Sequence, residues 1–146
     1  MIEIDSEESL EMDDVDAVME KMRKQNEEIL SDFEKYLIES GLTPKTISKH
    51  LDNIDFYINY YLLYDEFASP DKGHYRLDDF FCYFFPRKAM WSSTNSVKEN
   101  ITSLKKFYKY LNELSLITND ELKDMYSSIK ADKEDWLGLY DDESDD

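Results

Sequence analysis

Apolar residues along the chain recur at steps of three and four residues, which is the spacing of one buried face on an α-helix. The first such stretch covers residues 16–40 and is followed by Gly41, a residue suited to ending a helix. The second covers residues 43–64 and opens with Thr43 and Pro44, an N-cap residue followed by a proline at the first helical position. The pattern predicts two helices joined by a tight turn.

A short and very aromatic stretch at residues 77–85 follows a loop at residues 69–73 that is rich in turn-forming residues. It contains the longest unbroken run of apolar or aromatic residues, six in a row from Phe80 to Phe85. The residue before a proline disfavours the helical conformation. We therefore expect a short, deeply buried helix that ends near Pro86.

Two further helices are predicted, each with a capping box at its start. Ser96 and Glu99 have the capping-box spacing before a seam of apolar residues that reaches about residue 114, and Thr118 and Glu121 have it before the last apolar stretch. In a capping box the two side chains bond to each other's backbone N–H groups. The boxes predict where these two helices begin.

The shortage of turn-forming residues supports an all-α fold. Glycine and proline number three each, against an average usage of about 12% for the two together. All-β domains need both residues in many tight turns. We expect a compact bundle of four to five helices with a helical N-terminal extension and an acidic C-terminal tail.

Several classes of protein are excluded by simple counts. The three glycines lie far apart, so no glycine-rich nucleotide-binding loop is present, and Cys82 is the one cysteine, which fits a reducing cytoplasm. A membrane span needs roughly 18 apolar residues in a row, and an acidic N-terminus is unlike a signal peptide. We expect a cytoplasmic protein with no cofactor, no small-molecule substrate and no membrane segment.

The formal charge of −17 is concentrated at the two ends. Residues 1–20 carry nine acids and no base, residues 132–146 carry eight acids and one base, and residues 21–131 have a net charge of −1. The expected organisation is an acidic N-terminal segment (1–20, partly disordered or helical), a helical domain (21–131) and an acidic C-terminal tail (132–146). Such ends either keep the protein soluble or compete with an anionic ligand for a basic surface.

The residue types that carry catalysis are sparse. His50, His74 and Cys82 are scattered without the close spacing of metal motifs, and Cys82 lies in the aromatic run, where a buried inert thiol is expected. Asp78 and Asp79 fall in the first turn of a predicted helix, where they complement its dipole. We expect no catalytic or metal site and no enzymatic activity.

Tyrosines at helical spacing with Ile54 and Ile58 form a second group of interest: Tyr57, Tyr60, Tyr61 and Tyr64. A tyrosine ring can pack in a core or stack on a nucleic-acid base. We interpret most of these four as core or core-edge packing rather than as a stacking surface for bases.

Basic residues of the middle region gather at a few places. Lys45 and Lys49 lie one helical turn apart, Arg87 and Lys88 follow the aromatic run, and a third set falls on one flank of the predicted helix that ends near residue 114. This third set is Lys98, Lys105, Lys106 and Lys109. The pattern fits either an ordinary solvated surface or a phosphate-binding face built from two helices.

Two stretches resemble the SAM-like core-binding domain of tyrosine recombinases, also called phage integrases. Residues 32–57 (DFEKYLIESGLTPKTISKHLDNIDFY) resemble its opening, where a helix ends in a glycine-leucine turn and a Ser/Thr-x-x-Thr-Ile start leads into the next helix. Residues 96–117 (SVKENITSLKKFYKYLNELSLI) match the last long helix of that domain with its Leu-x-x-Phe-Tyr-x-Tyr-Leu core. The resemblance covers about residues 30–118.

The resemblance implies a helical bundle that holds one side of a DNA duplex through phosphate contacts. Thr43, Lys45, Thr46 and Lys49 correspond to the DNA-facing helix start in that family. The family's catalytic arginines, His-x-x-Arg motif and tyrosine nucleophile have no counterpart in the 146 residues. The expectation is a non-catalytic module that binds double-stranded DNA weakly, with a regulatory role for mobile-element or phage DNA. The alternative is a protein-interaction module whose acidic ends repel or imitate DNA.

Overall fold

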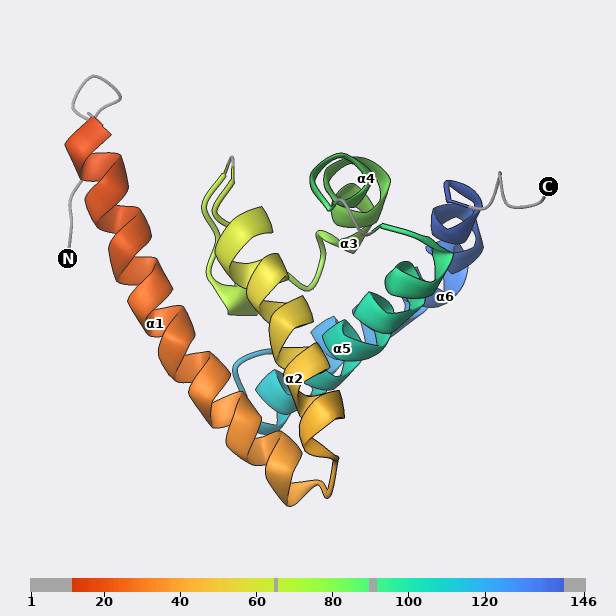
Figure 1. Cartoon of the computed structure of the whole chain (residues 1–146), viewed down its shortest axis with the longest axis horizontal. Coiled ribbons are helices and arrows are strands. Elements are labelled where there is room, and N and C mark those ends of the chain that lie inside the picture. Colours follow the sequence, from red (N-terminus) through yellow and green to blue (C-terminus); the bar gives the residue numbers. More distant parts are fainter. Residues whose placement is uncertain (1–11, 65, 90–91, 141–146) are drawn as a thin grey trace.

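The computed structural model describes residues 12–64, 66–89 and 92–140, and all regular structure within these ranges is helical (Figure 1). Four helices of twelve residues or more make up the bundle: α1 (Met12–Glu39), α2 (Pro44–Asp55), α5 (Thr94–Glu113) and α6 (Asn119–Gly138). The all-α compact bundle expected from the sequence is confirmed.

The turn between α1 and α2 follows the sequence prediction. Gly41 has a φ of +86°, a left-handed conformation that favours glycine. The Thr43 hydroxyl accepts a hydrogen bond from the Thr46 backbone N–H at 3.3 Å, and Pro44 occupies the first helical position. Local chemistry at four residues therefore fixes where one helix ends and the next begins.

Two wide helical turns interrupt the regular α-helical pattern in the middle of the chain. The end of α2 continues as the π-helix η2 (Phe56–Tyr61), and α3 (Leu77–Asp79) continues as the π-helix η4 (Phe80–Phe84). A π-turn bonds residues five apart rather than four, so each one shifts the positions that face the core. Both shifts fall in the most aromatic part of the protein.

The helix expected to end near Pro86 is longer than predicted. Pro86 lies in the first turn of α4 (Phe85–Lys88), which directly continues η4. A proline is tolerated at this place because its missing N–H is not needed at the start of a helix. The chain leaves the helical conformation at Ala89.

The second predicted capping box is confirmed and the first is displaced by three residues. Glu121 N–H donates to Thr118 Oγ1 at 3.0 Å, and Thr118 N–H donates to Glu121 Oε1 at 2.8 Å. At the start of α5 the reciprocal bonds join Ser93 and Ser96, at 3.1 Å and 2.7 Å. Ser93 has extended backbone and so serves as the N-cap, which places Ser96 inside the helix.

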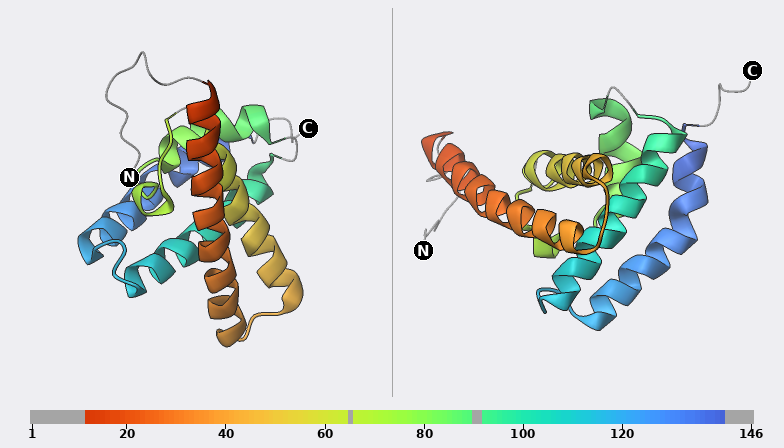
Figure 2. Two further views of the ribbon diagram at one scale, coloured as in Figure 1. Left: turned by 90° about the vertical axis from the view of Figure 1, so that its left-hand side faces the viewer. Right: turned by 60° about the horizontal axis from the view of Figure 1, so that its bottom comes forward.

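The helices are arranged around one core. The arms of α1 and α2 form a V that closes at the turn between them, and α5 crosses α2 (Figure 1). Helix α6 runs back beside α5 as an antiparallel neighbour (Figure 2). The segment α3–η4–α4 lies over the aromatic end of this core, between α2 and α6 (Figure 1).

Aromatic side chains dominate the core. The largest fully buried side chains include Phe33, Tyr57, Phe80, Phe81, Phe85, Phe107, Tyr108 and Trp136. The seam predicted on α5 is buried, with Leu104 exposed by 1% and Val97 by 0%. Burial of this much aromatic surface is the main stabilising contribution of the fold.

A short 3-10 helix, η3 (Pro70–Lys72), is held down by two buried tyrosines. Tyr57 Oη donates to the Gly73 carbonyl at 2.6 Å, and Tyr108 Oη donates to the Pro70 carbonyl at 2.7 Å. A Cβ atom at Gly73 would lie 2.6 Å from Tyr108 Oη and 2.9 Å from Leu62 Cδ1. This close approach of backbone to side chain requires glycine.

The acidic tail expected to begin at residue 132 needs a correction, because that boundary falls inside α6. Trp136 is fully buried, its ring lies 4.8 Å from the Phe81 ring, and its indole N–H donates to Asp78 Oδ1 at 2.8 Å. Tyr140 Oη donates to the Phe81 carbonyl at 2.9 Å. Residues 132–140 are therefore part of the bundle, as residues 12–20 are part of α1. The predictions for residues 1–11 and 141–146 concern positions outside the described residues.

Candidate nucleic-acid interface

The two helices that carry most of the predicted basic residues, α2 and α5, pack directly against each other. His50 Nδ1 lies 2.7 Å from the Ser103 hydroxyl, and Asn53 Nδ2 donates to the same hydroxyl at 3.0 Å. Lys49 Nζ lies 3.7 Å from Glu99 Oε2. Lys49 of α2 thus meets Glu99 of α5 at this crossing, and Lys106 lies near His50, whereas Lys105 lies over the Tyr126 ring of α6.

We call the resulting surface the lysine face. It comprises the lysines of the first turns of α2 and of the outer side of α5: Lys45, Lys49, Lys98, Lys105, Lys106 and Lys109. Lys106 is half-buried and the others are exposed. Charges from two rigid elements are the arrangement that phosphate contacts require.

The interactions that these lysines make within the described residues are weak. Lys109 Nζ pairs with Glu113 at 3.5 Å, and Lys105 Nζ lies 5.6 Å from the centre of the Tyr126 ring. Lys45 and Lys98 form no ion pair within the described part of the chain. An exposed ion pair contributes about 0–1 kcal/mol, so a phosphate can take the place of a carboxylate here at little cost.

His50 lies beneath the lysine face. Its side chain is buried at the crossing, where burial and the nearby Lys106 ammonium lower the pKa of His50 below its ordinary value of 6.5. The ring is therefore neutral at neutral pH. It links the two helices through Ser103 rather than adding a charge to the surface.

Thr43 and Thr46 have a structural role in the start of α2. The Thr43 hydroxyl donates to Thr46 Oγ1 at 3.0 Å and accepts the Thr46 backbone N–H. Both residues lie beside Lys45 at the edge of the lysine face. Their hydroxyl groups are already engaged in these two hydrogen bonds.

Arg87 and Lys88 do not lie on the lysine face. They occupy α4 and line a separate groove of about 650 Å³. Lys88 Nζ lies 4.8 Å from the centre of the Tyr64 ring, a cation–π contact. The ten candidate residues are thus divided between two surfaces.

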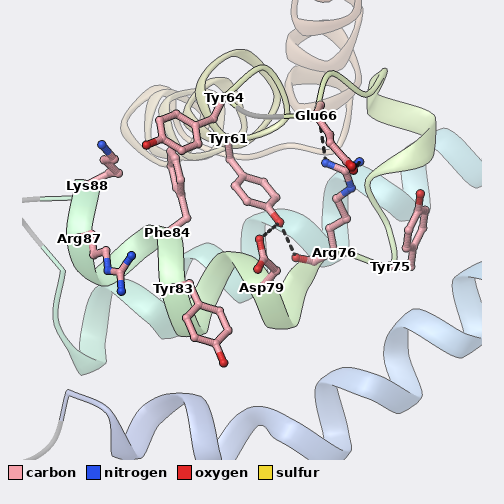
Figure 3. A pocket seen from close by; sticks show the side chains of 10 residues that line it. All are labelled: Tyr61, Tyr64, Glu66, Tyr75, Arg76, Asp79, Tyr83, Phe84, Arg87 and Lys88. Carbon is pink, nitrogen blue, oxygen red and sulfur yellow. Dashed lines mark hydrogen bonds and ion pairs between the residues drawn. The ribbon is translucent and has the colours of Figure 1, made fainter.

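We call this second surface the tyrosine groove (Figure 3). Its lining comes from η2, the loop after it, and the segment α3–η4–α4: Tyr61, Tyr64, Glu66, Tyr75, Arg76, Asp79, Tyr83, Phe84, Arg87 and Lys88. Cations lie toward both ends of the groove and aromatic rings lie between them (Figure 3).

The inner wall of the groove is a fixed polar network. Tyr61 Oη donates to Asp79 Oδ2 at 2.6 Å and lies 3.3 Å from the Arg76 carbonyl oxygen. Burial and the hydrogen bond to Asp79 raise the pKa of Tyr61 well above its ordinary value of 10.0. The Arg76 guanidinium pairs with Glu66 at 3.5 Å. The polar groups of this wall bond to one another, and these bonds hold the groove in shape.

The outer wall consists of tyrosines that the sequence interpretation placed mostly in the core. Tyr57 and Tyr61 are buried as expected, but Tyr64 is 60% exposed and Tyr60 is 53% exposed. Tyr83, within the run expected to be deeply buried, is 59% exposed. The buried positions of this segment, Leu77, Phe80, Phe81, Phe84 and Phe85, recur at three- and four-residue steps, which leaves Tyr83 on the outer side.

A second hollow of about 820 Å³ joins the two surfaces. Lys49 and Glu99 of the lysine-face side line it together with Tyr64, Phe84 and Lys88, which also line the tyrosine groove. The tyrosine groove and the lysine face are therefore neighbours. We call this second depression the connecting hollow.

We also examined the side chains that could act as a nucleophile or as metal ligands. The half-buried Cys82 thiol lies 3.5 Å from Asp78 Oδ1, and burial raises its pKa to about 11, so the thiol is protonated at neutral pH. Among the residues with described positions, no three His, Cys, Asp or Glu side chains form a group that could hold a metal ion.

Comparison with known proteins gives no assignment: the chain matches no family model, no curated protein and no solved structure. Within the described ranges, none of the helices has the length and apolar character needed to cross a membrane.

Proposed function

We propose that this protein is a non-catalytic DNA-binding module, related to the core-binding domain of tyrosine recombinases and regulatory for mobile-element or phage DNA. The observation that carries the proposal is the contact between α2 and α5. The Lys49–Glu99 pair brings the start of α2 to the turn of α5 that carries Lys98. The sequence resemblance covers the same two helices.

The lysine face can contact DNA phosphates but offers few groups that could recognise the base sequence. Its side chains are long cations on rigid helices, and phosphate contacts supply essentially all of non-specific DNA binding. The formal charge of −17 opposes this binding at long range, but the acids gather at the two ends of the chain. We therefore expect weak, strongly salt-dependent binding to duplex DNA.

The test is a fluorescence-anisotropy titration of the full chain against a short labelled duplex, from about 50 mM to about 200 mM salt. One variant replaces Lys45, Lys49, Lys98 and Lys109 with Gln. The control replaces an equal number of exposed lysines elsewhere: Lys35, Lys72, Lys123 and Lys130. Both variants have the same net charge, so a difference between them reports position.

We expect the lysine-face variant to lose most of the affinity and the control to lose little. Each phosphate contact removed lowers the slope of log affinity against log salt by about one unit. Equal losses in both variants would show diffuse charge rather than a site. No binding by the unmodified chain at the lowest salt would reject the DNA function.

A second candidate function is favoured by the first half of α1. Residues 14–20 of this helix are exposed or half-buried, contain Asp14, Asp16 and Glu20, and extend away from the bundle (Figure 1). A projecting acidic helix fits a basic protein partner and repels or imitates DNA. This protein-interaction function replaces the first if duplex DNA does not bind.

A further inference from the structure

Exposed aromatic side chains are concentrated at the tyrosine groove and the connecting hollow. Large hydrophobic side chains that are exposed in the described residues include four tyrosines, and all four line these two depressions: Tyr60, Tyr64, Tyr75 and Tyr83. Exposure of so much ring surface around two depressions is typical of a binding site.

The rings form a nearly continuous surface across the two depressions. Tyr60 lies 5.8 Å from Phe56 between ring centres, Phe56 lies 5.6 Å from Phe84, and Phe84 lies 5.3 Å from Tyr64. Flexible cations lie over the two outer rings of this chain of contacts, Arg23 over Tyr60 at 5.6 Å and Lys88 over Tyr64 at 4.8 Å, and must move aside for a ligand to stack there. Once they have moved, a flat ligand can stack on these rings.

Cations flank these rings, and the two acids of the tyrosine groove are already engaged. The connecting hollow is more acidic, since Asp52, Asp55 and Glu99 line it together with Lys49 and Lys88. Arg87 makes no ion pair with a described residue, and Lys88 contacts the ring of Tyr64. Asp79 accepts the hydrogen bond of Tyr61, and Glu66 pairs with Arg76. The remaining positive charge lies at the α4 end of the groove.

We propose that the tyrosine groove binds the unpaired bases of a single-stranded DNA segment whose adjoining duplex lies on the lysine face. This inference rests on the proposed function and names its substrate class. Sites for single strands combine cations that follow the backbone with aromatic rings on which bases stack. The connecting hollow, lined by Lys49, Tyr64 and Lys88, is the path between the duplex and the groove.

The size of the groove agrees with this ligand. Its volume of about 650 Å³ and that of the connecting hollow, about 820 Å³, are those of sites for organic ligands of nucleotide size. Stacking is tolerant of sequence because every base has a flat face. The preferred DNA is therefore a duplex with a single-stranded end, whatever its sequence.

The experiment compares three labelled probes on the full chain at low salt: a blunt duplex, the same duplex with a short thymidine overhang, and the overhang strand alone. One variant carries Tyr64→Ala and Tyr83→Ala. Its matched control carries Tyr64→Phe and Tyr83→Phe, which keep the rings and remove only the hydroxyl groups.

One stacked base contributes roughly 5- to 150-fold in affinity. We expect the overhang to strengthen binding at least about tenfold over the blunt duplex. The Ala variant loses this gain and keeps its affinity for the blunt duplex, whereas the Phe variant keeps both. Thermal unfolding of each variant confirms that the fold is intact.

The outcomes separate this inference from the proposed function. The inference is overturned if the blunt duplex binds and the overhang adds no affinity, or if the Ala variant keeps the added affinity. Either result is still consistent with duplex binding at the lysine face. Failure of every probe to bind rejects both, and the tyrosine groove is then a surface for a partner protein.

Discussion

Two sets of tyrosines in this protein have opposite surroundings. Tyr57 and Tyr108 are fully buried, and their hydroxyl groups hold the backbone carbonyls of Gly73 and Pro70. Burial raises the pKa of both well above the ordinary value of 10.0. The outer tyrosines of the groove are more than half exposed. The first set fixes the fold, and the second leaves ring surface free for a ligand.

The comparison teaches that the hydroxyl and the ring of tyrosine are used separately. Inner tyrosines need the hydroxyl, because a buried carbonyl without a donor costs free energy. Outer tyrosines need the ring, because stacking uses its flat face. Removing each group by itself therefore distinguishes folding from binding.

The largest loss of stability is expected from a substitution in the core beside the buried tyrosines, Tyr57 and Tyr108. Phe107 is fully buried, and its ring lies 5.1 Å from the Tyr108 ring and 5.2 Å from the Phe33 ring. Phe107→Ala should lower the free energy of unfolding by about 3–5 kcal/mol, measured by urea denaturation. A loss below about 0.5 kcal/mol would place Phe107 outside the core.

The second-largest loss of stability is expected at Gly73, where the backbone comes close to the buried tyrosines. Gly73→Ala places a methyl group within 3.0 Å of Tyr108 Oη and Leu62 Cδ1. We expect a loss of about 2–3 kcal/mol, since overpacking a rigid site forces its neighbours to move. Gly138→Ala is the control, because a Cβ there meets nothing within 4 Å. Equal stability of the two variants would contradict this account of η3.

The third effect compares the two sets directly. Tyr57→Phe removes the hydrogen bond to the Gly73 carbonyl and should cost about 1–2 kcal/mol. Tyr64→Phe, on the exposed set, should change stability by less than about 0.5 kcal/mol. Chemical denaturation of both variants measures the difference. If Tyr64→Phe is the more harmful, the assignment of the two sets is reversed.

The smallest effect concerns pH at the lysine face. The pKa of His50 is lowered in the folded protein, so the unfolded chain binds a proton there first as the pH falls through about 6.5. The stability that neutral His50 contributes is complete above that pH and is lost below it. His50→Gln removes the titration and keeps a polar group near Ser103.

Between about pH 8 and about pH 5, the unmodified protein should therefore lose stability relative to His50→Gln. Thermal unfolding at several pH values gives the difference directly, since the many carboxylates contribute equally to both proteins. A difference that stays constant with pH would show that His50 does not titrate in this window.

Much of the fold is predictable from local chemistry. The Gly41 turn, the Thr43-Pro44 start and the box at Thr118 and Glu121 depend on residues close in sequence, and all three have the predicted geometry. The buried seam of α5 follows from spacing in the same way. Short-range signals of this kind determine where helices begin and end.

The parts that could not be predicted depend on longer-range contacts. Tyr83 lies on the outer side of its helical segment, but the run Phe80 to Phe85 is apolar or aromatic throughout, so the sequence pattern does not mark which face is buried. Trp136 is buried although acids surround it in the sequence, because α6 packs on α3 and the indole N–H donates to Asp78, 58 residues away in the sequence. The tyrosine groove was missed for the same reason. The structure shows that α2 packs on α5, and the basic surface expected there stays a prediction.

The lysine face is tested most directly by an NMR titration of the full, nitrogen-15-labelled chain with duplex DNA at low salt. The account predicts that backbone amide shifts gather at residues 43–50 and 95–109 and are absent at residues 70–73, where the inner tyrosines hold the loop. The same shifts should vanish as salt is raised. Shifts spread evenly over the bundle, or none at the lowest salt, would contradict a DNA-binding surface at the crossing of α2 and α5.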